Sequence, residues 1–466
     1  MASDVLRNLA VKVKTTIDDL SSKGEVVPEQ EIFFRWKLDR FQYTDKGIID
    51  PKAHGEYITE KSWVRATSKV MNLIKESSEY DDASKQIVKI LGRSDLSFQV
   101  LDCFIQRVAH GYLCNSGFGE SQIDAIIEAF CKNLVDEPVK YGTEVELDGI
   151  VLRPDRIKLG DGITLRKTRP EDLERETLAR IPLMRPFLST PSAILGIELL
   201  ATSVNRIQEN VERSTALLRL FKVGSVKHSR YRMYSDSITD MLASGTIFSR
   251  ETGAPLESYL VTEADLPRLS EFWKQMSTNQ RIGLFQFPPG DDHISIAYSR
   301  YSDSLLQDGV FERRIMNAVM GLEALFLGSR ERGETSYRLS LRVGRLLGLL
   351  GHDPHKVKNV VRDSYRVRSS FVHGGFPSDK EKRRMESKYQ NIKNLLKLLL
   401  DYLRISIIFT MLSDKEKSEL VALIDHSFVD RKKEELLNAI VLQAKSIVLD
   451  EDLKLLEDQI KVSQEV

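Results

Sequence analysis

The residues best equipped for chemistry lie together in residues 362–373. This segment reads Arg362-Asp-Ser-Tyr-Arg366-Val-Arg368-Ser-Ser-Phe-Val-His373. Histidine titrates near neutral pH and can act as an acid or a base, whereas arginine stays charged and can hold a phosphate with two donors. These two residue types suffice to cut RNA without a metal, because the 2'-hydroxyl is an internal nucleophile and the protein has only to move protons and stabilise charge. RNA cleavage is therefore one candidate activity.

The same segment also has a structural interpretation, which its spacing alone favours. His373 can cap the carboxyl end of a helix, where the helix dipole stabilises a cation. The arginines can then form a solvated face with no role in binding. Spacing by itself does not decide between catalysis and capping.

The sequence around this segment resembles a known family. Arg368-Ser-Ser-Phe-Val-His373-Gly is similar to the R-x4-6-H motif of HEPN domains, and the sequence around it is similar to the Apea-like subgroup. Two further blocks of this resemblance precede the motif, at residues 320–326 and 333–343. Three ordered blocks, within roughly residues 300–412, are more specific than the short motif alone.

This resemblance implies a helical bundle that dimerises so that two motifs meet in one cleft. It also implies a metal-independent endoribonuclease that leaves 2',3'-cyclic phosphate and 5'-hydroxyl ends, frequently in prokaryotic antiviral defence or as a toxin. Arg368 and His373 are then the catalytic residues. Glu323 matches a recurrent family acid near the cleft, although a glutamate at a helix edge is more often simply paired with an arginine.

One position departs from the family pattern. Active members often carry Asn, Asp or His after the motif arginine, whereas this chain has Ser369. This departure favours an alternative of another class, a catalytically inactive HEPN-like module that binds RNA or a protein.

Helical geometry and the family motif favour different arginines. At about 100° per residue, Arg368 lies about 140° from His373 around the helix, whereas Arg366 and Arg362 lie within about 20° of it. An R-x6-H spacing also admits Arg366. The family alignment ranks Arg368 first, and Arg366 and Arg362 are then expected to bind RNA phosphates.

The sequence lacks the signature motifs of other common enzyme classes. It has no phosphate-binding P-loop, no G-x-S-x-G, no H-E-x-x-H and no strand followed by G-x-G-x-x-G. The three cysteines have no C-x-x-C spacing, which argues against a zinc site or a disulfide framework. His352 and His355 are three residues apart but lie in a turn without a nearby cysteine. No metal or cofactor is expected.

Two more segments, residues 33–41 and 227–234, interleave aromatic and basic residues. Such a pattern can stack on bases, but it more often marks a half-buried element with one wet face.

The charge distribution adds to the case for RNA. The whole chain balances 68 Lys+Arg against 68 Asp+Glu, but residues 301–400 hold 19 basic and 11 acidic residues, a net charge of +8. An excess of this size points to a polyanion partner, although a basic helix face can also be solvated or pair with the acidic tail that follows.

Helices must position the motif. Apolar residues at helical spacing predict helices ending near Gly328 and Gly351, and a third that begins with Asp353 and Pro354 and ends at residues 374–375. A long helix is expected over about residues 379–412, with weaker ones over 414–424 and 431–448. The last domain, residues 291–466, is therefore predicted to be an all-α bundle.

The preceding residues predict two further domains. Residues 1–135 show a helical pattern that predicts a mostly helical domain, and residues 136–290 change to short alternating runs typical of antiparallel hairpins. A strand pair is expected over residues 216–223 and 226–234, and Thr168 and Pro170 predict the start of a helix. The fold class is thus multidomain α+β and mostly α.

Location and partners follow from the same features. The longest apolar stretch, residues 395–412, is interrupted by Lys397, Asp401 and Arg404, and no signal peptide is evident. A cytoplasmic protein without membrane contact is expected. We also expect a homodimer through the last domain, because one motif has one histidine, and a protein activator bound by the upstream domains.

Overall fold

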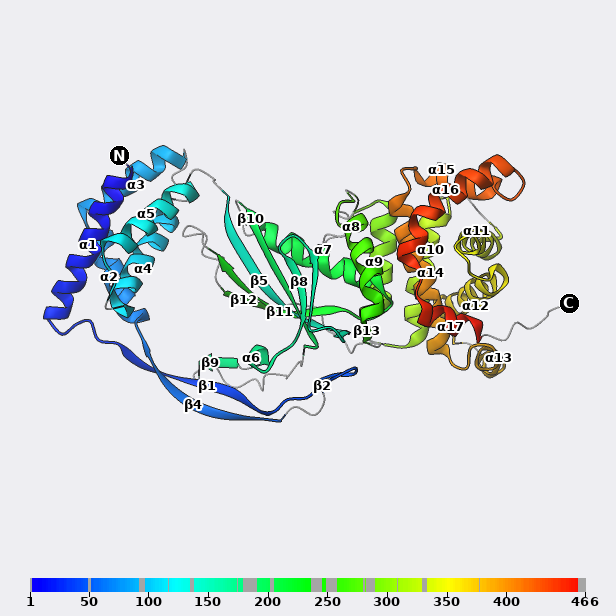
Figure 1. Cartoon of the computed structure of the whole chain (residues 1–466), viewed down its shortest axis with the longest axis horizontal. Helices are drawn as coiled ribbons and strands as arrows, with labels where there is room; N and C mark the ends of the chain where they lie inside the picture. The colour runs from blue at the N-terminus through cyan, green and yellow to red at the C-terminus, as the bar shows by residue number, and fades with distance from the viewer. Residues whose placement is uncertain are drawn as a thin grey trace. The chain divides into compact units, whose positions relative to one another are not determined.

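The structure is a computed structural model of the chain (Figure 1). It describes residues 2–48, 52–91, 97–115, 117–134, 138–173, 175–178, 191–201, 205–235, 245–248, 258–279, 281, 290–307, 309–328, 333–376 and 378–459. The chain forms two compact units. Unit 1 comprises residues 1–146, 162–208 and 229–249, and unit 2 comprises residues 147–161, 209–228 and 250–466. The chain thus alternates between the units, and the expected boundaries at residues 135 and 290 stay predictions.

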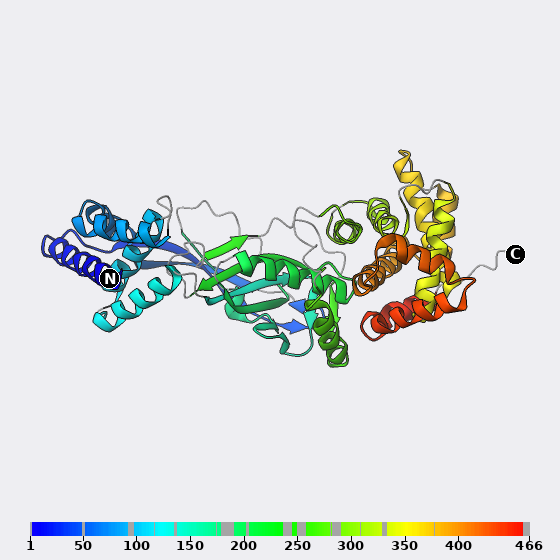
Figure 2. The ribbon, with the colours of Figure 1, turned by 90° about the horizontal axis from the view of Figure 1, so that it is seen from above.

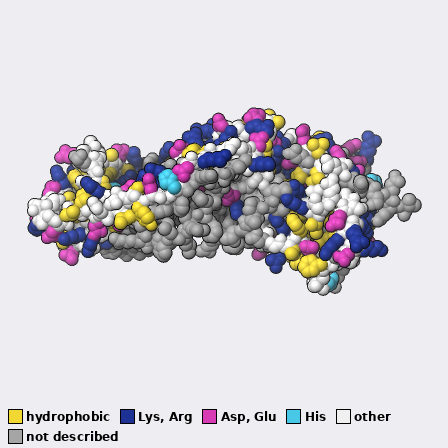
Figure 3. All heavy atoms as spheres, turned by 90° about the horizontal axis from the view of Figure 1, so that it is seen from below, with side chains coloured by type: hydrophobic (Ala, Val, Ile, Leu, Met, Phe, Trp, Pro, Cys, Tyr) yellow, Lys and Arg dark blue, Asp and Glu magenta, His cyan; other side chains and the backbone are white. Residues whose placement is uncertain are grey.

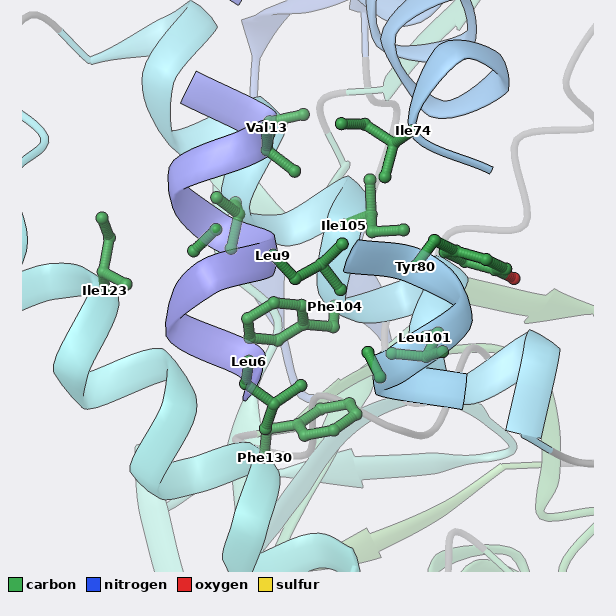
Figure 4. Packing of buried hydrophobic residues seen from close by; sticks show 14 of the residues in the cluster. Leu6, Leu9, Val13, Ile74, Tyr80, Leu101, Phe104, Ile105, Ile123 and Phe130 are labelled. Atoms are coloured by element: carbon green, nitrogen blue, oxygen red, sulfur yellow. The ribbon is translucent and has the colours of Figure 1, made fainter. Parts of the chain in front are cut away.

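Unit 1 begins with a helical bundle. Its helices are α1 (Ala2–Ser22), α2 (Val64–Lys75), α3 (Ser78–Leu91), α4 (Ser97–Cys114) and α5 (Glu120–Leu134). Their apolar faces share one core, in which Leu9, Phe104 and Ile105 are fully buried (Figure 4). The rings of Phe104 and Phe130 lie 5.1 Å apart between centroids. The helical periodicity of this part of the sequence is confirmed by these helices.

A long hairpin interrupts this bundle in the sequence. Strands β1 (Glu29–Arg40) and β4 (Lys52–Ser62) pair antiparallel, and β9 (Arg175–Leu178) pairs with the other edge of β1. The prediction of a mostly helical first domain holds for α1 to α5, but neither β1 nor β4 was predicted. The sequence of β1 alternates apolar and charged residues from Phe34 to Asp39, a period of two that favours a strand. The short strands β2 (Tyr43–Thr44) and β3 (Gly47–Ile48) also pair antiparallel.

The predicted change to short strands after residue 136 is confirmed. The strands are β5 (Val139–Asp148), β6 (Ile150–Leu152), β7 (Arg156–Gly160), β8 (Ile163–Lys167), β10 (Ala193–Ala201), β11 (Lys227–Ser235), β12 (Gly245–Phe248) and β13 (Tyr259–Val261). In the sheet, β12, β11, β5, β10 and β8 are successive neighbours. The β10–β8 and β11–β12 pairs are antiparallel, whereas β6 and β13 of unit 2 pair in parallel.

Two helices lie among these strands. The helix expected after Thr168 exists, but α6 (Pro170–Leu173) is only one turn long. The strand expected over residues 216–223 is wrong, because α7 (Asn205–Phe221) continues through it. Leu217, Leu218 and Leu220 are all buried there, so the end of α7 is apolar on several faces. A short apolar run of this kind, interrupted only by Arg219, cannot be told from a buried strand by periodicity.

Unit 2 holds the helices that follow residue 265 (Figure 2). They are α8 (Leu266–Ser277), α9 (His293–Leu306), α10 (Phe311–Phe326), α11 (Thr335–Leu349), α12 (Pro354–Val372), α13 (Asp379–Tyr389), α14 (Ile392–Leu412), α15 (Lys417–His426), α16 (Arg431–Val448) and α17 (Glu451–Asp458). Within this bundle α14 packs against α9, α10, α12, α16 and α17. The described structure is mostly helical with antiparallel sheets, as expected for a multidomain, mostly α chain.

The helix predicted over residues 379–412 is two helices. Gln390 has a φ of 66°, which takes the backbone out of the helical conformation. The next residue, Asn391, caps α14, because its side chain accepts a hydrogen bond from the backbone N–H of Asn394 at 2.9 Å. The break sets α13 apart as a separate element beside α12.

The charged residues of α14 are part of the core. Arg404 is fully buried, lies 2.7 Å from Asp401, and donates to the carbonyl oxygens of Leu220 and Phe221 at 3.0 Å. It thereby ties the end of α7 to the bundle, because an unpaired buried charge would be very costly. Among the described residues, no helix has the length and apolar character needed to span a membrane.

Candidate active site

The motif lies on α12, whose ends and buried face agree with the sequence. Asp353 caps its start by accepting from the backbone N–H groups of His355 and Lys356 at 2.8 and 3.2 Å. Val360, Ser364 and Val367 are buried on one face of the helix. The helix packs against α10, α11 and α14. Its polar residues are therefore held on a rigid scaffold.

Arg368 is anchored on α10 by Glu323. The Nη2 atom of Arg368 lies 3.5 Å from Oε2 of Glu323, and the two side chains are 27% and 21% exposed. Burial raises the pKa of the Glu323 carboxyl, and the charge of Arg368 and a hydrogen bond from Tyr365 oppose this rise. Glu323 is thus both near the motif and paired with an arginine, the two roles that the sequence left open.

Tyr365 completes this arrangement and was not singled out by sequence reasoning. The guanidinium carbon of Arg368 lies 5.4 Å from the centre of the Tyr365 ring, within cation–π range. The Tyr365 hydroxyl lies 2.9 Å from Oγ1 of Thr335 on α11. Three helices therefore fix the orientation of one arginine.

The Arg368 side chain keeps capacity for a ligand. Its Nε is buried and has no hydrogen-bond partner in the described part of the chain. A guanidinium has five N–H donors, so the contact with Glu323 leaves several of them for an anion.

His373 lies at the end of α12 and faces solvent. Its backbone N–H donates to the carbonyl oxygen of Ser369 at 3.2 Å, so the residue caps the helix. Within the residues that the structure describes, its imidazole has no hydrogen-bond or ion-pair partner. His373 therefore occupies the C-cap position through its backbone. Its catalytic role stays a prediction.

Arg366 is tied to a buried carboxylate. Asp363 is 3% exposed, and its Oδ1 accepts from Arg366 at 3.1 Å and from Arg384 of α13 at 2.9 Å. Its Oδ2 accepts from Tyr389 at 2.8 Å and lies 3.4 Å from Nζ of Lys388. Burial and the charge of Asp363 raise the pKa of the Tyr389 hydroxyl. This cluster fastens α13 to α12.

Arg362 has a more local contact. Its Nη2 donates to Oδ1 of Asn359, one turn earlier on α12, at 3.1 Å. The three arginines of this segment therefore have different partners. Arg368 contacts Glu323 of α10, Arg366 contacts Asp363, and Arg362 contacts Asn359 on its own helix.

The weaker candidates have structural roles in the described residues. His352 is buried, and its Nδ1 lies 2.5 Å from Oε2 of Glu457, whereas His355 is exposed. In residues 33–41, Lys37 pairs across the hairpin with Glu56 at 2.7 Å. In residues 227–234, Arg230 pairs with the buried Glu146.

Part of the positive excess of residues 301–400 is used inside the bundle. Arg314 and Arg342 are buried, and Arg342 pairs with Asp425 at 2.6 Å. Arg314 lies on α10 and Arg342 on α11. Over the part of the chain that carries α10 and α11, at the right of Figure 3, Lys and Arg side chains are mixed with acidic and hydrophobic ones. The net charge of the sequence therefore overstates the charge available to a polyanion.

Comparison of the chain with protein-family models, with curated proteins and with solved structures finds no match.

Proposed function

We propose that the chain is a metal-independent endoribonuclease with a HEPN-like bundle, in which Arg368 holds the scissile phosphate and His373 moves protons. One observation carries this proposal. Arg368 is oriented by Glu323 and Tyr365, while His373, five residues later on the same helix, is exposed and its imidazole has no partner among the residues that the structure describes. An oriented cation and an available acid or base on the same helix are the groups that the reaction needs, although they lie about 140° apart around an ideal helix.

In the proposed reaction the 2'-oxygen bonds to phosphorus and the bond from phosphorus to the 5'-oxygen breaks. A base takes the proton of the 2'-hydroxyl, and an acid gives a proton to the departing 5'-oxygen. Arg368 stabilises the negative charge that grows on the phosphate oxygens. Because one motif has one histidine, a homodimer through this bundle would supply the second proton-transfer group by symmetry.

The upstream residues fit a regulatory role in this proposal. A nuclease that cuts essential RNA in the cytoplasm must be held inactive until it is needed, as in antiviral defence or a toxin system. Some 290 residues precede the nuclease bundle and are enough to bind a protein activator.

The experiment is RNA cleavage by the purified full chain in EDTA, with His373→Ala as the control. We expect cleavage in EDTA and 3' ends that resist phosphatase until acid opens the cyclic phosphate. Cleavage that is lost in EDTA and restored by magnesium or manganese would contradict the mechanism.

The second candidate is a catalytically silent HEPN-like module that binds RNA or a protein. Ser369 favours it, and so does the ion pair, because Glu323 already offsets part of the Arg368 charge. RNA binding without cleavage, equal in the wild type and in His373→Ala, would support this alternative.

A further inference from the structure

A small pocket of about 110 Å³ lies between α12 and α13. Two arginines and one serine give it donors, and two aliphatic side chains give it apolar walls. These residues are Arg366, Val367 and Ser370 of α12, and Arg384 and Met385 of α13. Asp363 and Glu381 also line it.

The two guanidinium groups are held close together by one oxygen atom. Oδ1 of Asp363 accepts from Nη1 of Arg366 at 3.1 Å and from Nη2 of Arg384 at 2.9 Å. Their side chains remain 47% and 41% exposed. Each arginine therefore donates one hydrogen bond to Asp363 and has other N–H donors for a ligand. The contact with Asp363 also fixes the orientation of each guanidinium group.

The charges around the pocket favour an anion. Asp363 is shared by Arg366, Arg384 and Lys388, so three cations surround one buried carboxylate. The other carboxylate, Glu381, accepts from the backbone N–H and the hydroxyl of Ser378, both at 2.8 Å. These five charged groups sum to +1.

Phosphate suits this geometry better than a single-point anion does. Its oxygens can accept from two guanidinium groups at once, which is the arrangement in which arginine binds most strongly. The Ser370 hydroxyl adds a third donor. Ser370 also precedes His373 by three residues, about 4.5 Å along the helix axis, so the pocket is at the motif end of α12.

We propose that this pocket binds a phosphate group of the RNA, separate from the phosphate that is cleaved. The inference rests on the proposed function for the identity of the polymer. It assigns to Arg384 a binding role that its position outside the motif does not suggest. Arg366 and Arg384 would act together as one phosphate clamp.

The test compares two neighbouring charge deletions in a full chain that cannot cut, His373→Ala. Arg384→Ala removes one side of the clamp, whereas Arg383→Ala removes the same charge from an exposed residue that does not line the pocket. We expect Arg384→Ala to weaken binding of a single-stranded RNA about tenfold and to lower the salt dependence by about 0.7, and Arg383→Ala to change affinity less than twofold. Equal effects of the two variants would overturn the proposal.

Arg384→Lys separates binding from folding, because it keeps the charge beside Asp363 but loses the planar fork. It should bind RNA with affinity between those of the parent and Arg384→Ala, with the same thermal unfolding as the parent. An affinity loss that follows the unfolding temperature across the three variants would contradict a binding role.

Inorganic phosphate distinguishes RNA from a free phosphate compound. It should raise the unfolding temperature of the wild type above that in sodium chloride at the same ionic strength, and should do so less for Arg384→Ala. Protection by phosphate without any effect of Arg384→Ala on RNA binding would overturn the assignment to RNA.

This test is also separate from the test of cleavage. A wild type that binds RNA through Arg384 but never cuts it would refute the nuclease and retain the pocket. Normal cleavage with RNA affinity that does not depend on Arg384 would support the nuclease and refute the phosphate pocket.

Discussion

Arg368 and Glu323 face each other across the interface of α12 and α10, with 3.5 Å between Nη2 and Oε2. The pair is only partly buried, so it orients the guanidinium without removing it from solvent. A fixed cation of this kind loses little conformational entropy when an anion binds. The following predictions depend on this relationship and on the Asp363 cluster beside it.

Comparing the pH dependence of stability in the wild type and in Glu323→Gln tests whether the Glu323 carboxyl is buried in the folded state. Burial raises the pKa of Glu323 above its ordinary value of 4.5, so the folded state favours the neutral acid. The contribution of protonated Glu323 to the free energy of unfolding is complete below the ordinary pKa of a glutamate. It is lost as pH rises through the raised pKa of Glu323 in the folded state. The wild type should therefore lose stability relative to Glu323→Gln over that window. Denaturant unfolding from pH 4 to 8 measures this, and a difference that stays constant or falls with pH would contradict it.

Tyr365→Phe separates the ring of Tyr365 from its hydroxyl. The ring should still contact Arg368, but the hydrogen bonds to Glu323 and Thr335 are lost. We expect a severalfold fall in the rate of RNA cleavage with little change in RNA affinity, because Arg368 is less well oriented. Single-turnover kinetics measure both quantities. An equal loss in the matched variant Tyr337→Phe, which alters an exposed ring on α11, would argue against a positioning role.

Asp363→Asn should destabilise the last bundle. Arg366, Arg384 and Lys388 would then surround a neutral side chain. Of these cations only Lys388 is buried with Asp363, and loss of one partner from a buried ion pair costs about 3–5 kcal/mol. Chemical denaturation should show this loss, while Glu386→Gln on the exposed side of α13 should change the free energy of unfolding by less than about 0.5 kcal/mol. Similar stabilities for the two variants would mean that the cluster does not hold α13.

The chain should sediment as a dimer. One protomer has a mass of 53.2 kDa and carries one motif, and the proposed reaction needs an acid as well as a base. Sedimentation equilibrium at micromolar concentration should give about twice the mass of one chain. A monomer with full cleavage activity would exclude a shared active site.

The sequence predicted the elements whose signals are local. The helix α12 has one apolar face, a capping Asp353 and a proline at its first position, so both its existence and its start could be read directly. Sequence reasoning expected residues 33–41 to form a half-buried element with one wet face, but it missed the strand β1 because it did not use the period of two in these residues. It missed the break at Gln390 because no glycine or proline marks the left-handed residue.

The site could be predicted only in part, because much of it depends on contacts between helices. The motif and the family resemblance suggested Arg368, His373 and Glu323. The partners of Asp363 lie on α13, 21 to 26 residues later, and no local pattern predicts that one carboxylate gathers them. Tyr365 was within the motif region, but its role depends on Glu323 and Thr335 of other helices.

The central claim is that Arg368 and His373 act together on the scissile phosphate. Its most direct test is RNA cleavage in EDTA by the full chain and by Arg368→Ala, His373→Ala and Arg366→Ala. We predict that the first two variants fold normally and do not cleave, because neither side chain belongs to the apolar core of α12. Arg366→Ala should still cleave at saturating RNA and lose only affinity. Normal cleavage by Arg368→Ala, with or without loss in Arg366→Ala, would contradict the account.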